Sequence, residues 1–277
     1  MKKDFNINID KLVIAYNRNE ATDYILSQLN EQNEGDFVEF TLHPSTSFPN
    51  FNYCYDIVAD SNVIGHIYWG HFNPTLQNIY VKYNNKALYF NNKLYMTYIE
   101  EKLNLKFEKI ANIDIACDFN FNIINKIYKI LRNKDLDIKI LNKIYGIDDI
   151  IPVLTHASGT RKKLFENKSI TILSKSHDIG LFAYNKSREI AENGNTKRYI
   201  TDTNQFKETE TTYRLEIRCR HKELRNTLEA LSITEDELYM LALCDNKERI
   251  GEVYRHLIDR IIMVRAGRKS QSILTFL

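Results

Sequence analysis

The strongest constraint on the fold is a pair of short stretches in which apolar and charged residues alternate. In residues 113–119 the odd-numbered side chains are apolar, whereas Asp114 and Asp118 lie on the opposite face of an extended chain. Residues 213–220 repeat this period of two. The charged face of the second stretch carries Arg214, Glu216, Arg218 and Arg220. The pattern predicts two strands of a sheet that has one apolar face and one charged face.

Strand-like and helix-like periods are mixed along most of the chain, while residues 133–165 follow neither. Strands are expected at 10–16, 37–42, 53–59, 63–70, 78–83, 87–90, 109–120, 169–173, 180–184 and 213–220. Helices are expected at 20–32, 94–105, 123–131, 186–192, 222–231, 234–243 and 246–266. We therefore expect an α+β domain over residues 1–221, followed by a C-terminal helical segment over residues 222–277.

Several classes of protein are disfavoured by what the sequence lacks. It has no run of 18 apolar residues and no apolar stretch near its N-terminus, which argues against a membrane helix and a secretory signal. It also lacks a P-loop and a GxGxxG motif, which argues against nucleotide hydrolysis and dinucleotide redox chemistry. The 4 cysteines show no CxxC spacing, so we expect buried thiols in a reducing cytoplasm rather than a zinc site.

Positive charge concentrates in one part of the chain. Residues 156–225 contain 15 Lys and Arg against 9 Asp and Glu, although the whole chain has a net charge of only +2. A surface that binds a polyanion such as DNA needs a local excess of this kind. A solvated basic face is the alternative explanation, and charge alone favours that alternative.

Two carboxylates are expected to meet on the charged face of the sheet. Asp114 and Asp118 are roughly 13 Å apart along one strand, so they cannot share one metal ion. If the strands of residues 113–119 and 213–220 are neighbours, one aspartate lies near Glu216 and a cation must compensate the pair. A divalent metal ion or the adjacent arginines could compensate the two carboxylates. The alternative is that these residues form ordinary structural ion pairs with no role in function.

A tyrosine near these carboxylates has the chemistry for attack on a phosphodiester. Tyr184 offers a hydroxyl at the end of a predicted strand, and Lys186 offers positive charge two residues later. Asp114 and Glu216 offer oxygen ligands for a metal ion. A tyrosine at a strand end more often packs in the core, so the residue type alone favours a structural role.

Three stretches in this order resemble motifs of the rolling-circle replication initiators, which include plasmid-type initiators, nickases of integrative elements and replication proteins of filamentous phages. Residues 113–119 resemble the family strand with two aspartates. Residues 171–176 and 181–186, with Glu189, are similar to its central hairpin and Tyr-x-Lys-x-x-Glu segment. Residues 213–218 are similar to its Arg-x-Glu strand. Together the motifs span about residues 110–225.

The resemblance implies an antiparallel sheet flanked by helices and an enzyme that nicks and rejoins one DNA strand through a phosphotyrosine. It implies Mg²⁺ or Mn²⁺ as cofactor, and as partners origin DNA (single-stranded or in a hairpin), a host helicase and a second copy of the chain. The implied metal ligands are Asp114, Asp118 and Glu216, and the implied catalytic residues are Tyr184, Lys186 and Tyr199. The implied DNA-binding residues are Lys175, Arg188, Arg214, Arg218 and Arg220.

One departure from the family pattern keeps other functions open. Leu173 stands where the plasmid-type members would have their tyrosine, in the first strand of the hairpin. The nucleophile is then elsewhere, with Tyr184 the first choice and Tyr199 the second, or the protein binds DNA without cleaving it. An α/β protein of unrelated function, with ordinary ion-pair strands, is the third hypothesis.

Overall fold

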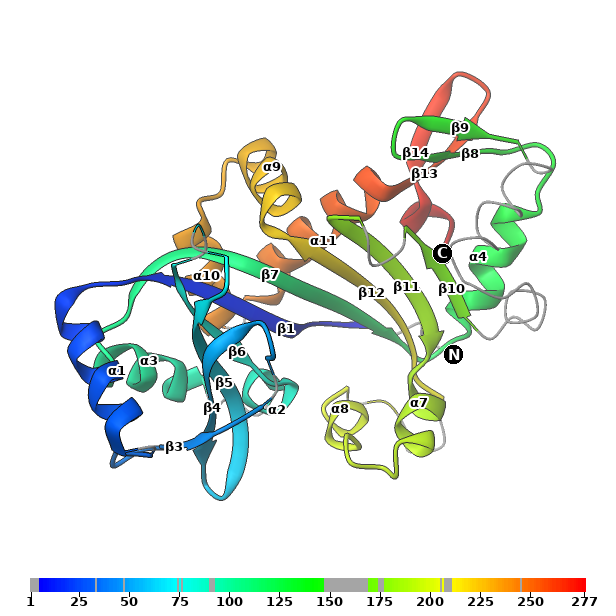
Figure 1. Cartoon of the computed structure of the whole chain (residues 1–277). Coiled ribbons are helices and arrows are strands. Elements are labelled where there is room, and N and C mark those ends of the chain that lie inside the picture. The colour runs from blue at the N-terminus through cyan, green and yellow to red at the C-terminus, as the bar shows by residue number, and fades with distance from the viewer. Residues whose placement is uncertain are drawn as a thin grey trace. The chain divides into compact units, whose positions relative to one another are not determined.

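The computed structural model describes residues 5–32, 34–46, 48–73, 75, 77–89, 93–146, 169–173, 177–204, 206, 211–244 and 246–277. The fold is α+β, with antiparallel strands flanked by helices, as the sequence predicts (Figure 1). The chain divides into two compact units. Unit 1 comprises residues 1–8, 114–233 and 245–277, and unit 2 comprises residues 9–113 and 234–244.

Unit 2 contains a meander of antiparallel strands in the order β1-β6-β5-β4-β3-β2. These strands are β1 (Phe5–Asn17), β2 (Gly35–Asp36), β3 (Thr41–Pro44), β4 (Phe51–Ala59), β5 (Asn62–His71) and β6 (Ile79–Tyr83). Its helices are α1 (Glu20–Gln32), α2 (Asn85–Tyr89), α3 (Lys93–Lys102) and α10 (Glu235–Cys244). Ile14, Ile57 and Ile67 are fully buried in its core, as the period of two requires.

Helices α1, α3 and α10 are tied to the strands of unit 2 by side-chain hydrogen bonds. The Tyr55 hydroxyl donates to the Leu29 carbonyl in α1 at 3.3 Å. The Glu100 carboxylate in α3 accepts 2.7 Å hydrogen bonds from the hydroxyls of Tyr16 in β1 and Tyr239 in α10. The half-buried Glu100 carboxylate is satisfied by two phenol donors, and among the described residues no cation pairs with it.

This carboxylate gives a testable dependence of stability on pH. Burial raises the pKa of the Glu100 carboxyl, although the hydrogen bonds from Tyr239 and Tyr16 lower it in part. As pH rises above the ordinary value of 4.5, the unfolded chain releases this proton first, so the contribution of Glu100 to stability falls. Glu100→Gln keeps an acceptor for both phenols and is expected to gain stability over wild type as pH rises from 4 to 7. Urea unfolding at several pH values checks this, and a difference that stays constant with pH would contradict it.

Unit 1 contains two antiparallel sheets. The first has the order β10-β11-β12-β7, and the second has the order β14-β13-β8-β9. The strands are β7 (Lys106–Phe119), β8 (Asp137–Ile140), β9 (Lys143–Tyr145), β10 (Ser169–Ile172), β11 (Ile179–Asn185), β12 (Tyr213–Arg220), β13 (Ile262–Ala266) and β14 (Lys269–Ser272). The helices are α4 (Ile123–Leu131), α7 (Lys186–Glu192), α8 (Tyr199–Asp202), α9 (His221–Leu231), α11 (Lys247–Ile261) and the 3₁₀ helix η1 (Ile273–Phe276). Strands β1 and β7 each have residues in both units.

The apolar faces of β11 and β12 are covered by helices. Both α4 and α11 contact these strands, and the Tyr254 hydroxyl of α11 donates to the Leu215 carbonyl at 2.8 Å. Leu215, Ile217 and Cys219 are fully buried there, as the alternation in the sequence predicts. Because successive side chains of a strand point to opposite faces, the charged residues of β12 must lie on the face that these helices do not cover.

Three parts of the chain differ from their sequence-based predictions. The helix expected over residues 246–266 ends at Ile261 and continues as β13, which forms a hairpin with β14 around Gly267. Residues 87–90 were expected as a strand, but Asn85–Tyr89 form helix α2. Residues 37–42 hold only the start of strand β3, because the sheet pairs Thr41 and Leu42 but not the residues before them. Short runs of four to six residues do not distinguish strand from helix, since they cover too few repeats of either period.

The remaining sequence-based predictions have mixed outcomes. Helices α1 and α4 have the bounds that were expected. The segment expected as a helical tail contributes α10 to unit 2 and contributes α9, α11 and the β13–β14 hairpin to unit 1. Cys54, Cys117 and Cys219 are buried and form no disulfide, as expected. Within the described part of the chain, every helix is too short or too polar to cross a membrane.

Candidate functional site

The charged face of the first sheet in unit 1 brings together most of the residues that the sequence singles out. Strands β7 and β12 are neighbours, which confirms the arrangement needed to place Asp114 near Glu216. On β11, Tyr184 lies opposite Arg214 and Phe182 lies opposite Glu216. These side chains share one face because paired residues in an antiparallel ladder point the same way.

Asp118 and Arg214 form an ion pair in the interior of unit 1. The Arg214 Nε and Nη2 atoms donate to the two Asp118 carboxylate oxygens at 2.6 and 2.8 Å. Both side chains are 0% exposed, and Asn204 Nδ2 donates a further hydrogen bond to Asp118 Oδ2 at 2.9 Å. The guanidinium of Arg214 is buried against Asp118, so the DNA contact predicted for Arg214 would require this ion pair to open.

Asp114 and Glu216 share a second arginine. Arg218 Nε lies 3.4 Å from Asp114 Oδ2, and its Nη2 lies 3.8 Å from Glu216 Oε1. The guanidinium also sits over the Phe182 ring, 5.1 Å from its centroid. Arg218 is 32% exposed, in contrast to Arg214, so it remains a candidate for contact with DNA. In this arrangement an arginine compensates the two carboxylates, which is one of the two arrangements expected from the sequence.

Tyr184 is hydrogen bonded to a carboxylate. Its hydroxyl donates to Glu216 Oε2 at 2.7 Å, and the ring is half-buried at the end of β11. The Lys186 ammonium lies 5.7 Å from the centroid of the Tyr184 ring and forms a 2.7 Å ion pair with Glu189. Lys186 itself is buried, so it supplies positive charge near the phenol rather than a contact on the surface.

A local feature of the chain sets the position of Tyr184 and Lys186. Asn185 ends β11 and caps helix α7, because its side chain accepts a 2.8 Å hydrogen bond from the Arg188 backbone N–H. The chain therefore turns from strand to helix between Tyr184 and Lys186. This turn brings the side chain of Lys186 back over the ring of Tyr184 instead of leaving it further along the same strand.

The other predicted site residues that the structure describes lie on helices α7 and α8 and at the last position of β12. Tyr199 is the first residue of helix α8, not part of a strand. Arg188 is exposed and pairs with Glu192 at 2.7 Å, whereas Arg220 is half-exposed and pairs with Asp178 at 3.7 Å. Lys175 lies outside the described residues. Asn204 was missed, because it follows a short helix and contacts Asp118 across 86 positions of sequence, with no periodic signal.

The three predicted metal ligands are not arranged to bind one metal ion together. Both oxygens of Asp118 are engaged by Arg214 and Asn204, so Asp118 does not fit as a ligand. Asp114 and Glu216 have the carboxylate oxygens that Mg²⁺ and Mn²⁺ prefer, and the cation between them is Arg218. In the part of the chain that the structure describes, no three His, Cys, Asp or Glu side chains gather as a metal site. The use of a metal ion stays a prediction that concerns Asp114 and Glu216.

Comparison with known proteins gives a likeness to solved structures. No family model matches the chain, and no curated protein matches it either. The structure of the rolling circle replication initiator protein from Geobacillus stearothermophilus is similar, with a TM-score of 0.49 and 14% sequence identity. The alignment covers 96% of this chain and 89% of that one. A likeness at this level does not assign the chain to a family or its residues to roles.

Proposed function

We propose that this protein is a rolling-circle replication initiator that cleaves and rejoins one DNA strand through Tyr184. The observation that carries the proposal is the 2.7 Å hydrogen bond from the Tyr184 hydroxyl to Glu216. A phenol becomes a nucleophile when a nearby base accepts its proton, and this contact places the base within proton-transfer distance. The order of the sequence motifs and the basic excess of residues 156–225 also support this function.

The proposed reaction exchanges one phosphodiester for another. The Tyr184 Oη atom bonds to phosphorus, its proton passes to Glu216 Oε2, and the bond from phosphorus to the 3′ oxygen of the DNA breaks. The released 3′ oxygen takes a proton from water, and the 5′ phosphate stays on the tyrosine. Lys186 and Arg218 are the nearby cations whose fields favour the negative charge that develops on the phosphoryl oxygens.

A metal ion enters the proposal only through Asp114 and Glu216. Mg²⁺ or Mn²⁺ held by these carboxylates would neutralise charge on the phosphoryl oxygens. Arg218 would then leave its place between the carboxylates, and its 32% exposure gives the side chain room to move toward solvent or DNA. Chelation with EDTA is expected to stop cleavage while binding of single-stranded DNA persists.

The central test is the formation of a covalent adduct with DNA. Single-stranded oligonucleotides of random sequence, incubated with the protein and Mn²⁺, are expected to give a protein–DNA band in a denaturing gel. A 3′ label should enter the band and a 5′ label should not, because the tyrosine would hold the 5′ phosphate. Tyr184→Phe is expected to remove the band, whereas Tyr199→Phe should retain it.

The other results of this experiment have definite meanings. Loss of the band in Tyr199→Phe alone would identify Tyr199 of helix α8 as the nucleophile. DNA binding without a band in the wild type would favour a DNA-binding replication or regulatory protein with no cleavage activity. The presence of Leu173 at the family's tyrosine position favours that second function. Failure to bind DNA even at low salt, where phosphate contacts are strongest, would exclude both.

A further inference from the structure

We propose that a cavity in unit 1 binds a small apolar carboxylic acid, with its hydrocarbon part among phenylalanines and its carboxylate at Arg255. The cavity has a volume of about 470 Å³, within the range of small-molecule sites. Its walls come from the start of β1, the end of β7, helix α11 and the C-terminal residues, all of which belong to unit 1.

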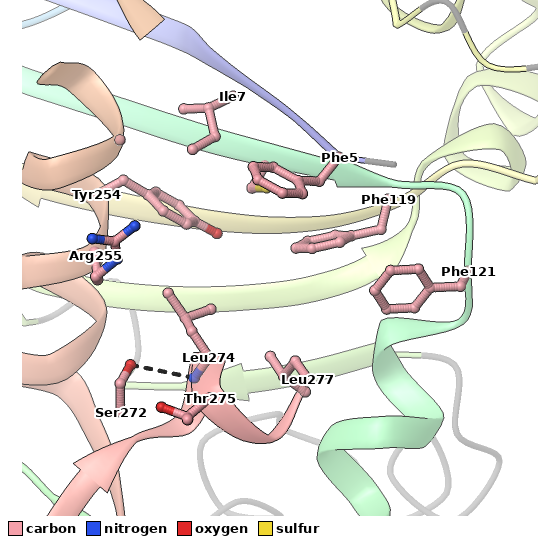
Figure 2. A pocket seen from close by; sticks show the side chains of 12 residues that line it. Phe5, Ile7, Phe119, Phe121, Tyr254, Arg255, Ser272, Leu274, Thr275 and Leu277 are labelled. Carbon is pink, nitrogen blue, oxygen red and sulfur yellow. Dashed lines mark hydrogen bonds between the residues drawn. The ribbon is translucent and has the colours of Figure 1, made fainter. Parts of the chain in front are cut away.

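One end of the cavity is aromatic. Phe119 and Phe121 have ring centroids 5.2 Å apart, and Phe5 lies beside them at the right of the view in Figure 2. Phe5 is 65% exposed, so its ring remains largely in contact with water. Leu274 and Leu277 form the apolar wall drawn below these rings. A hydrocarbon chain or aromatic ring placed here would remove apolar surface from water, which is the main source of affinity for such ligands.

The other end of the cavity carries a cation and two hydroxyl groups. Arg255 lies at the left of the view in Figure 2, with Ser272 and Thr275 below it. Among the residues that the structure describes, no carboxylate pairs with Arg255. The Ser272 Oγ atom already accepts a 3.3 Å hydrogen bond from the Leu274 backbone N–H, although its own hydrogen can still be donated. An arginine without a carboxylate partner favours a ligand with a carboxylate, which can accept two parallel hydrogen bonds from the guanidinium.

This gradient from aromatic to cationic determines the class of ligand. A purely apolar molecule would leave Arg255 unused, and a small inorganic anion would leave the aromatic end empty. A medium-chain or aryl carboxylic acid satisfies both ends. Cys117 and Phe119 line the cavity from the face of β7 opposite to Asp118, so the site is separate from Tyr184 and Glu216. The inference therefore does not depend on the proposed DNA chemistry.

The test uses decanoate and decanol as probes, each below its solubility or micelle limit, with affinity measured by calorimetry. Decanoate is expected to bind about tenfold more tightly than decanol. Arg255→Gln should remove this preference, whereas Lys222→Gln, an exposed cation on α9, should leave it unchanged. Gly251→Met should block both probes, because Gly251 lines the cavity and a methionine side chain there would occupy its volume. The new Cβ atom would lie 3.3 Å from the end of the flexible Ile7 side chain, which can shift slightly.

Thermal unfolding of each variant confirms that it is folded before its affinity is interpreted. Replacing glycine inside helix α11 removes an unfavourable helix residue, so Gly251→Met should retain its fold. Undiminished decanoate binding by Gly251→Met would place binding elsewhere and overturn the proposal. Equal affinity of the wild type for decanoate and decanol, or no binding of decanoate, would overturn it as well.

Discussion

Asp118→Ala is expected to lower the free energy of unfolding by about 3–5 kcal/mol, because it leaves the Arg214 guanidinium buried without a counterion. Both side chains are 0% exposed, and two hydrogen bonds of 2.6 and 2.8 Å join them. The total stability of a typical domain is about 5–15 kcal/mol, so this loss would leave much of the protein unfolded at elevated temperature. Urea unfolding followed by circular dichroism measures the change.

Two further variants show whether the unpaired charge is the cause. Asp114→Ala removes a carboxylate from the same strand, but its partner Arg218 is 32% exposed and can turn to water. We expect this variant to lose about 1 kcal/mol. The double variant Asp118→Leu with Arg214→Met removes both charges and should recover most of the stability lost in Asp118→Ala. Equal losses for Asp114→Ala and Asp118→Ala would contradict the distinction between the two pairs.

Glu216→Gln is expected to slow formation of the DNA adduct by about 10²–10⁴-fold, the usual effect of losing a general base. The amide still accepts a hydrogen bond from the Tyr184 hydroxyl but cannot take its proton at neutral pH. The rate is measured in a single turnover with a labelled oligonucleotide and excess protein. Glu223→Gln, on helix α9 and paired with Arg260, serves as the control and should react at the wild-type rate.

The dependence on Mn²⁺ separates the two roles proposed for Glu216. If higher Mn²⁺ restores the rate of Glu216→Gln, the carboxylate acts mainly as a metal ligand. If the rate stays low at every concentration, the proton-accepting role is supported. A wild-type rate for Glu216→Gln at low Mn²⁺ would rule out both roles.

The sequence predicts which residues share a face but not how deeply they are buried. The alternation in residues 113–119 correctly placed Asp114 and Asp118 on one face of β7, and the neighbouring strand β12 was also anticipated. Nothing in that pattern distinguishes the two aspartates. Asp118 differs because Asn204 contacts it from 86 positions away. Contacts over such separations depend on tertiary packing, which a local period does not encode.

The end of helix α11 shows a second limit of local patterns. Ile258, Ile261, Ile262 and Val264 are all buried, and their spacing is compatible with a longer helix. The chain instead becomes strand β13, because Ile262 and Val264 pair with Ile140 and Ile138 of β8. Strand β8 lies in the segment that the sequence left unassigned, so its partner could not be recognised either. Gly267, with φ of +62°, then allows the tight turn into β14.

Each unit is built from separate segments of the chain, and this affects how the protein folds during translation. Unit 2 is incomplete until residues 234–244 have been synthesised, because α10 supplies the Glu235 carboxylate that accepts a hydrogen bond from the Ile110 backbone N–H at 2.8 Å. Unit 1 combines residues 1–8 with residues 114–233 and 245–277. A nascent chain therefore cannot complete either unit early in translation, and pairings between distant segments fold slowly. Expression of either half alone would yield exposed strand edges and aggregation rather than a stable fragment.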